Sequence, residues 1–189
     1  MSELSETIQE SASHSIESKM NARVAICVAI TATFMALCNV KDGNVVQAMS
    51  QAQAHSIDAW SYYQAKSTKE AILQNSVENL KVQKSNGYEE LVKSQEQQIV
   101  RYEKEKAEIK KQAEGFSKEY EDINVFDDQF DMTDALLSIA IAMFGITALT
   151  QKKWLYYFSV GASVLGIALG LAAFLKISLH SDLISKILG

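Results

Sequence analysis

The residue types that most often bind metals or act as nucleophiles are few and far apart in this chain of 189 residues. Its three histidines, His14, His55 and His180, fall in different segments, with no cysteine or carboxylate at metal-ligand spacing around them. Cys27 and Cys38 are the only cysteines. On a helix, a rise of about 1.5 Å per residue puts them roughly 16 Å apart, beyond the reach of a disulfide. We therefore expect these three histidines and two cysteines to have packing or surface roles.

The motifs of the common enzyme classes are also missing. The sequence contains no Gly-rich phosphate loop, no Gly-x-Ser-x-Gly elbow and no His-Glu-x-x-His motif. Its 23 acidic and 18 basic residues are mixed along the chain, so the formal charge of -5 leaves no basic stripe for a phosphate backbone. We therefore expect a protein without catalytic residues, cofactor or metal, and without a nucleic-acid partner.

One group of carboxylates has the composition of a cation site: Asp127, Asp128, Asp131 and Asp134. Hard cations such as Ca²⁺ prefer clustered carboxylates, and assembly of several chains would concentrate the negative charge. A local explanation competes with this one. Asp131 followed by Asp134 is typical of a helix N-terminus, where acids oppose the positive end of the helix dipole. We interpret the group as a cap and keep cation binding as the alternative.

The elements that must position these residues are helices. The chain has no proline and only eight glycines, so little interrupts a helix. Its apolar residues gather into three blocks, at 24–40, 132–150 and 154–177. The last two are long enough to cross about 30 Å of hydrocarbon, and the first is near the lower limit. Acidic residues before the first block argue against a cleaved signal peptide. We therefore expect an all-α membrane protein with three transmembrane helices.

The orientation follows from short basic segments. Residues 151–153, Gln-Lys-Lys, form a short basic loop, which favours the cytoplasmic side. The long polar segment then lies outside, and the N-terminus with Lys19 and Arg23 lies inside. The predicted organisation is a cytoplasmic N-terminal tail (1–22), a first transmembrane helix (23–43), an extracytoplasmic helical hairpin (44–130) with its turn at 85–88, a second transmembrane helix (131–150), a cytoplasmic loop (151–153), a third transmembrane helix (154–177) and a C-terminal tail (178–189).

The polar segment has the pattern of an antiparallel coiled coil. Ser85-Asn86-Gly87 is a turn signal that divides it into two arms, 44–85 and 88–126. Eight of ten seam positions of the returning arm are apolar or aromatic, namely Val92, Ile99, Ala113, Tyr120, Tyr102, Ile109, Phe116 and Ile123, with Lys106 and Gln95 as the exceptions. On the outgoing arm Ser56, Lys66 and Glu70 interrupt the matching pattern. We interpret the polar positions as setting the register at a cost in stability.

Aromatic residues on the outgoing arm suggest an interface. Folding back at the turn is expected to place Trp60 near Ala113 and Tyr63 near Lys110. Consecutive helical residues point about 100° apart, so Trp60, Tyr62 and Tyr63 cannot all face the seam. At least one tyrosine should then face a second chain or a partner, the alternative being a ring lying along the surface of the stalk. Two helices also leave much apolar surface open, so we expect several hairpins to bundle together.

The membrane blocks contain a second candidate contact surface. Ala162, Gly166 and Gly170 repeat every four residues, a small-xxx-small pattern that lets helix backbones touch. The stripe faces either another helix of the same chain or another subunit, and both alternatives remain open. Thr31 and Thr33 are the most polar groups of the first block, and each can bond to its own preceding helical turn. No charged residue lies deep in any block, which argues against an ion-coupled transporter.

One stretch of the sequence resembles a known family. The residues Asn39-Val40-Lys41, Gly43 to Met49, and Asp58-Ala59-Trp60-Ser61-Tyr62-Tyr63-Gln64-Ala65-Lys66-Ser67 resemble a bacterial membrane-protein family known only as domain-of-unknown-function family 4337. The likeness covers most of the chain after the N-terminal tail. It implies a bacterial inner membrane and three membrane helices, and it supplies no activity.

These observations predict a non-enzymatic scaffold or interaction protein that self-associates through the hairpin and the membrane helices. Its expected partners are membrane lipids, further copies of itself and other inner-membrane proteins. The residues expected at an oligomer or partner interface are Trp60, Tyr62, Tyr63, Ala162, Gly166 and Gly170. One alternative is an accessory subunit of a larger membrane complex. Another is an oligomeric channel lined by Thr31, Thr33 and Asn39.

Overall fold

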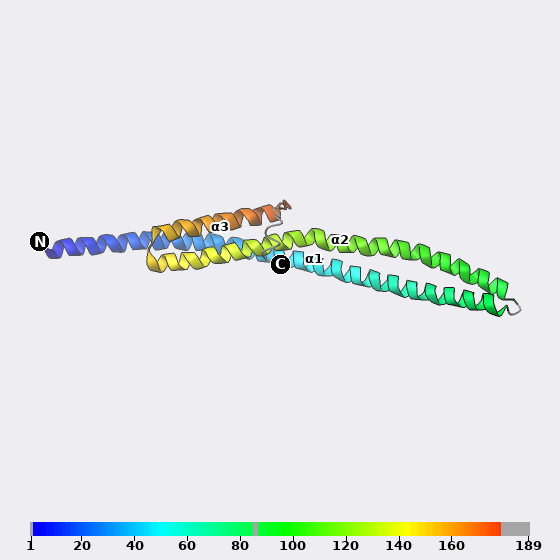
Figure 1. The fold of residues 1–189 in the computed structure, drawn as a ribbon. Coiled ribbons are helices and arrows are strands. Elements are labelled where there is room, and N and C mark those ends of the chain that lie inside the picture. Colours follow the sequence, from blue (N-terminus) through cyan, green and yellow to red (C-terminus); the bar gives the residue numbers. More distant parts are fainter. Residues whose placement is uncertain (1, 85–86, 179–189) are drawn as a thin grey trace. The chain divides into compact units, whose positions relative to one another are not determined.

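The computed structural model describes residues 2–84 and 87–178, with side chains described from Lys19 onward. These residues form three helices and no strand: α1 (Ser2–Gln83), α2 (Tyr88–Thr150) and α3 (Lys153–Phe174) (Figure 1). The prediction of an all-α fold is confirmed. Ser85 and Asn86 of the expected turn, His180, Lys186 and the rest of the C-terminal tail from 179, and the side chain of His14 lie outside the described residues.

Both long helices continue where separate helices were expected. α1 runs through Gly43, and α2 runs through Asp131. A glycine inside a helix costs only about 1 kcal/mol relative to alanine, and no proline is present to remove a backbone hydrogen bond. The interpretation of Asp131 and Asp134 as an N-terminal cap is wrong, because α2 begins at Tyr88. The acids that do oppose its dipole are Glu89 and Glu90 in the first turn.

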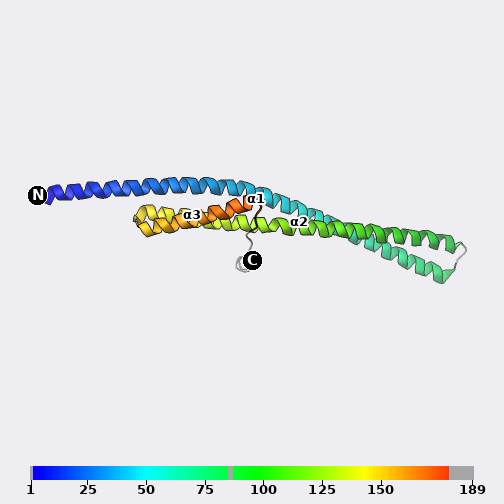
Figure 2. The same ribbon diagram turned by 90° about the horizontal axis from the view of Figure 1, so that it is seen from above.

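The chain divides into two compact units that share the long helices. Residues Met1–Val46 and Asn124–Gly189 form one unit, which we call the three-helix unit, and Gln47–Ile123 form the other, which we call the polar unit. In the polar unit the segments of α1 and α2 lie side by side in both views (Figures 1 and 2).

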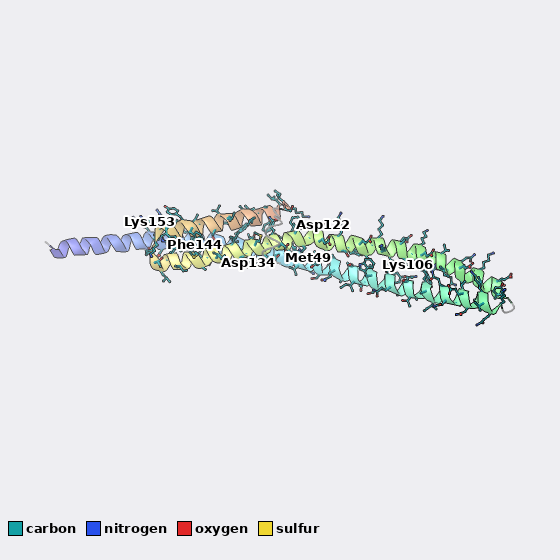
Figure 3. The ribbon with its side chains drawn as sticks, viewed as in Figure 1. Met49, Lys106, Asp122, Asp134, Phe144 and Lys153 are labelled. Atoms are coloured by element: carbon teal, nitrogen blue, oxygen red, sulfur yellow. The ribbon has the colours of Figure 1, made fainter. Side chains whose placement is uncertain are left out.

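The three-helix unit has apolar contacts among all three helices. One cluster centres on Val24, Ala140 and Phe144, against which Tyr156 and Val160 of α3 pack. A second centres on Cys38, Phe130 and Ala173. Phe144 is labelled in Figure 3. Because these side chains come from helices far apart in the sequence, the two clusters hold the helices of this unit together.

The outer surface of the three-helix unit is also apolar. Many large hydrophobic side chains are exposed there, among them Ile26, Ile30, Leu37, Ile139, Ile146, Phe158, Val164, Leu165 and Leu171. A soluble unit would not leave so many apolar side chains in contact with water. By length and composition, α1, α2 and α3 each contain a stretch that can cross a membrane.

The two segments of the polar unit run antiparallel. Cross-helix hydrogen bonds join Ser56 to Ser117 (2.9 Å) and Lys81 to Glu96 (2.7 Å), so residue numbers rise along α1 as they fall along α2. All ten seam positions expected on α2 are buried or half-buried. The heptad spacing therefore identifies the face of α2 that packs against α1.

Candidate functional site

The middle of the polar unit contains charged side chains surrounded by tyrosines. We call this group the charge–tyrosine cluster. It consists of Tyr62, Tyr63, Lys66 and Glu70 from α1 and of Tyr102, Glu105 and Lys106 from α2. Lys66 and Glu70 lie on successive turns of one helix face, and Tyr62 and Tyr63 both belong to the turn before Lys66, because positions three and four apart are neighbours on an α-helix. Continuous helix on both sides holds the cluster in place.

Two ion pairs cross the seam at this cluster. Lys66 Nζ contacts Glu105 Oε2, and Lys106 Nζ lies 2.6 Å from Glu70 Oε2 (Figure 3 labels Lys106). The second pair is the more enclosed, with 18 % of the Lys106 side chain and 10 % of the Glu70 side chain exposed. Each helix therefore supplies one cation and one anion. A shift of the register by one turn would separate both pairs and leave buried charges without partners.

Tyrosine rings complete the surroundings of both lysines. Lys66 Nζ lies 4.8 Å from the centroid of the Tyr102 ring and 5.3 Å from that of Tyr62. Lys106 Nζ lies 5.7 Å from the centroid of Tyr63. A cation over an aromatic face is attracted by the ring quadrupole, by roughly 0.5 to 2 kcal/mol depending on how far it is removed from water. Carboxylates and aromatic rings thus both offset the cost of removing the two lysine ammonium groups from water.

The pKa values in the cluster move in the directions that ion pairing requires. Hydrogen bonds from Lys66 and Arg101 lower the pKa of Glu105. The hydrogen bond to Glu105 raises the pKa of Lys66, and the hydrogen bond to Glu70 raises the pKa of Lys106. These shifts favour the charged forms of Glu105, Lys66 and Lys106.

The predicted aromatic residues lie at the edge of this cluster. Trp60 and Tyr63 are half-buried and meet edge to face, with ring centroids 5.7 Å apart. Tyr62 is 54 % exposed. Tyr63 was expected near Lys110, but its ring lies against Lys106, one turn away. The reason is that Lys106 is held in the seam by Glu70, whereas Lys110 is exposed and lies 3.8 Å from Glu114 on its own helix.

Sequence reasoning recognised Lys66, Glu70 and Lys106 as interruptions of the seam but did not pair them with each other or with Glu105. The charges on the two arms could have predicted these ion pairs. In an antiparallel pair folded back near Gly87, Lys66 comes opposite the region of Glu105 and Glu70 opposite the region of Lys106. Opposite charges at matching positions of two seams predict cross-helix ion pairs.

The small residues of α3 pack inside the three-helix unit. Gly166 is buried, and a Cβ atom there would lie 2.7 Å from Leu137 Cδ2. Gly170 is buried too, and Ala162 packs on the cluster around Phe144. Of the two alternatives for this stripe, packing within the chain accounts for both glycines. These two positions therefore present no free surface to a partner.

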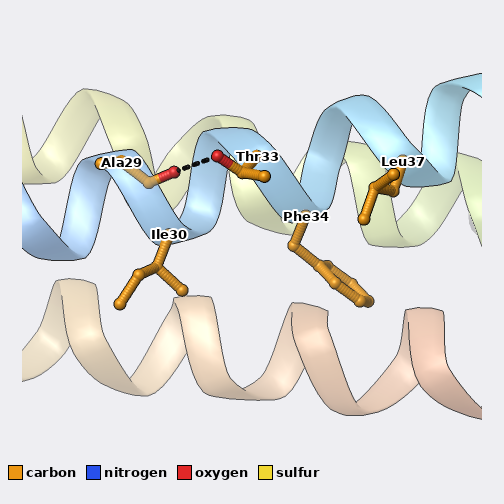
Figure 4. Close-up of a pocket in the computed structure, with 5 residues that line it drawn as sticks. All are labelled: Ala29, Ile30, Thr33, Phe34 and Leu37. Carbon is orange, nitrogen blue, oxygen red and sulfur yellow. Dashed lines mark hydrogen bonds between the residues drawn. The ribbon is translucent and has the colours of Figure 1, made fainter.

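The two threonines of the first apolar block lie in different surroundings. Thr31 is buried, and its hydroxyl is 2.7 Å from Ser163 Oγ of α3. Thr33 is exposed and donates to Ala29 O at 2.7 Å. Thr33 lies with Ile30, Phe34 and Ala29 along an open apolar groove, from which Ile30 and Phe34 point toward the ribbon coloured as α3 (Figure 4). The groove lacks the converging polar groups of a catalytic pocket.

Replacing Thr31 by valine should lower the stability of the three-helix unit by about 0.6 to 1.7 kcal/mol, because Ser163 loses its partner. Thr33→Val is the matched control, since its hydroxyl bonds only to its own helix. Cys38, which is 1 % exposed, can report unfolding in a Cys27→Ala background through the temperature at which a thiol dye reacts. Equal melting temperatures for Thr31→Val and Thr33→Val would contradict the prediction.

Carboxylates gather where α1 and α2 meet in the three-helix unit. Asp127 is hydrogen bonded to Asp42, and Asp131 and Asp128 are close enough to act on its charge. Burial, followed by repulsion from Asp131 and Asp128, raises the pKa of Asp127. Among residues 19–84 and 87–178, no group of three or more His, Cys, Asp or Glu has the geometry of a metal site. The arrangement is a group of carboxylates that repel one another.

Asp127→Asn should therefore stabilise the protein at neutral pH. A carboxyl whose folded pKa lies above its unfolded value contributes full stability only at low pH and loses it as the pH rises through the folded pKa. The variant should melt at a higher temperature than the parent at pH 7.5, and this advantage should shrink as the pH falls toward the ordinary pKa of aspartate. Asp122→Asn, at an exposed position of α2, is the control. An increase in melting temperature that does not depend on pH would show that the charge of Asp127 is not its cause.

The order of segments in this chain, two long helices that contribute to a polar unit followed by a third apolar helix, can be compared with known families. Residues 20–176 match the family described as "Domain of unknown function (DUF4337)". The chain belongs to this family. The match confirms the resemblance seen in the sequence and covers both units of the DUF4337 chain. Searches of curated proteins and of solved structures found no match.

Proposed function

We propose that this DUF4337 protein is a non-enzymatic scaffold of a bacterial inner membrane that associates with further copies of itself. In this proposal α1, α2 and α3 cross the membrane, the N-terminus lies in the cytoplasm, and the polar unit forms a coiled-coil hairpin in the periplasm. The apolar outer surface of the three-helix unit supports the membrane setting. The short basic connection at Lys152 and Lys153 supports the orientation.

The observation that carries the scaffold proposal is the aromatic surface formed by Trp60 and the two α1 tyrosines of the charge–tyrosine cluster. Tyr62 is 54 % exposed, and the half-buried Trp60 and Tyr63 lie near it on the same helix, α1. Tyrosine and tryptophan are enriched where proteins bind each other, because a large ring buries much area at little cost in conformational entropy. Covering this aromatic surface with another protein would remove its apolar area from water, and this would stabilise the assembly.

The assembly mass tests this proposal. The native protein in lipid nanodiscs should have a mass that is a multiple of 20.9 kDa, measured by light scattering or native mass spectrometry. Tyr62→Ser should shift the distribution toward smaller species. Val100→Ser, at a position of α2 that is 64 % exposed, should leave it unchanged. A strictly monomeric protein without companions would rule the scaffold out. Co-purification of another protein at fixed stoichiometry would favour an accessory subunit instead.

The orientation has its own test. In a background with Cys27→Ala and Cys38→Ala, a single cysteine at Lys111 of the polar unit should react with a membrane-impermeant maleimide in intact spheroplasts. A cysteine at Lys153 should react only after the membrane is opened. Both positions are exposed in the structure, so a difference in labelling reports the side of the membrane. The reverse pattern would invert the topology.

A further inference from the structure

The two helices of the polar unit differ sharply in charge. Of residues 88–123, 17 are charged, whereas residues 47–83 contain six charged residues: Asp58, Lys66, Lys69, Glu70, Glu78 and Lys81. Lys66 and Glu70 are buried in the seam with α2. Four charged residues of this part of α1 are exposed, namely Asp58, Lys69, Glu78 and Lys81, whereas fifteen are exposed on α2. Exposed helix faces of soluble coiled coils are normally charged.

Six uncharged residues of α1 form a continuous surface, which we call the α1 outer face, and the exposed Asp58 borders it. It consists of Ala54, Ile57, Ser61, Ala65, Thr68 and Ile72, all of them exposed. Their spacing of three and four residues places them within one helix face, because each residue turns by about 100°. Ile57 is 58 % exposed and Ile72 is 62 % exposed. The face thus has two large apolar side chains separated by small ones.

The hydroxyl groups on this face are already bonded. Ser61 donates to Ile57 O at 2.8 Å, and Thr68 donates to Gln64 O at 3.0 Å. Side chains that bond to the preceding turn leave no donor without a partner when the surface is covered. The α1 outer face can therefore be buried without the cost of stranding a polar group. A seam of this composition is suited to close contact between helices.

We propose that the α1 outer face is where two copies of this chain meet, with α1 against α1 and both α2 helices on the outside. This inference rests on the proposed self-association and names the surface that carries it. The lack of charge on the α1 outer face determines which kind of surface can bind to it. An uncharged face pairs without penalty only with another uncharged face, because a charge buried opposite it has no partner. Within residues 47–84 and 87–123, the α1 outer face itself provides such a surface, and the charged outer side of α2 does not.

Two copies in the same membrane send α1 out on the same side, so the helices meet in parallel. Each residue of the α1 outer face then lies beside the same residue of the second copy. Ala54, Ser61 and Ala65 are small enough for the helix axes to approach closely, and Ile57 and Ile72 pack at either end. Tyr62 points about 100° away from Ser61, so it flanks this face and is not part of it.

Disulfide cross-linking tests the arrangement in the full-length protein in native membranes, with Cys27→Ala and Cys38→Ala as background. Ala65→Cys and Ile72→Cys should each give a covalent dimer on mild oxidation. Val100→Cys on α2, equally exposed, is the control and should stay monomeric. Cross-linking at Ala65 but not at Ile72 would indicate antiparallel helices and overturn the parallel arrangement. Cross-linking at Val100 alone would assign the contact to α2.

Charge insertion separates this inference from the scaffold proposal. Ile57→Lys combined with Ile72→Lys should weaken dimer formation by about tenfold or more, because two charges per chain enter a contact that lacks counter-charges. Val100→Lys should have no effect. Circular dichroism checks that the helix content is retained. If the parent assembles and the double variant assembles equally well, the α1 outer face is not the contact, although the scaffold stands. If the parent is monomeric, both proposals fail.

Discussion

Replacing Gly170 by leucine should destabilise the three-helix unit by about 3 kcal/mol, the upper part of the range for inserting side-chain atoms into a packed core. A Cβ at this position would already lie 2.8 Å from Phe34 Cε1, 3.0 Å from Thr133 Cγ2 and 3.1 Å from Cys38 Sγ. These atoms belong to side chains of both α1 and α2, so leucine cannot be accommodated unless these side chains or α3 itself move.

Gly161→Leu is the matched control on the same helix, because no atom lies within 4 Å of a Cβ at Gly161. It should retain the melting temperature of the parent or exceed it slightly, since leucine favours a helix over glycine by about 1 kcal/mol. The measurement is loss of helical circular dichroism on heating in mild detergent. Equal melting temperatures for the two variants would show that α3 does not pack on α1 and α2 at Gly170.

Lys106→Glu should be the most damaging single change in the polar unit. It removes the partner of Glu70 and places a third carboxylate beside Glu70 and Glu105. Breaking a buried ion pair costs about 3 to 5 kcal/mol, and partial exposure of this pair reduces the expected loss to about 2 kcal/mol. The charge swap Glu70→Lys with Lys106→Glu restores opposite charges and should recover most of the loss.

A double-mutant cycle on Glu70 and Lys106 isolates this interaction from the effects of each substitution on its own. Hydrogen exchange of the amides on both sides of the seam is the measurement, because it reports opening of the polar unit separately from the three-helix unit. Lys104→Glu, at an exposed position of α2, controls for the change in net charge. Additive effects of the two single substitutions would show that the pair contributes nothing to the register.

Local patterns in the sequence predicted the helices and the buried face of α2. Val92 and Ile109 are buried, and the polar exceptions Gln95 and Lys106 are half-buried in the same columns. Burial of the two polar side chains could be foreseen because heptad position, not polarity, decides which side of a helix meets its neighbour. The same reasoning works for α1, where Met49, Ala52 and Val77 are buried.

The features that the sequence did not reveal depend on contacts between helices. Asp131 has the pattern of a helix start, but nothing breaks α2 there, so the carboxylates form a repelling group inside a continuous helix. The neighbour of Gly170 could not be identified from its spacing, because both a helix of the same chain and a second subunit satisfy a small-residue stripe. Thr31 could bond to its own turn, and only the position of α3 shows that Ser163 is its partner.

The contacts of Gly170 also bear on how the protein is made. Its neighbours Phe34 and Cys38 lie in α1 and Thr133 lies in α2, so the surface that receives α3 consists of two helices synthesised earlier. Ser163 of α3 likewise meets a hydroxyl of α1. A ribosome synthesises α3 after both helices that form its binding surface. A nascent chain that stalls before Lys153 therefore leaves Thr31 without its partner hydroxyl.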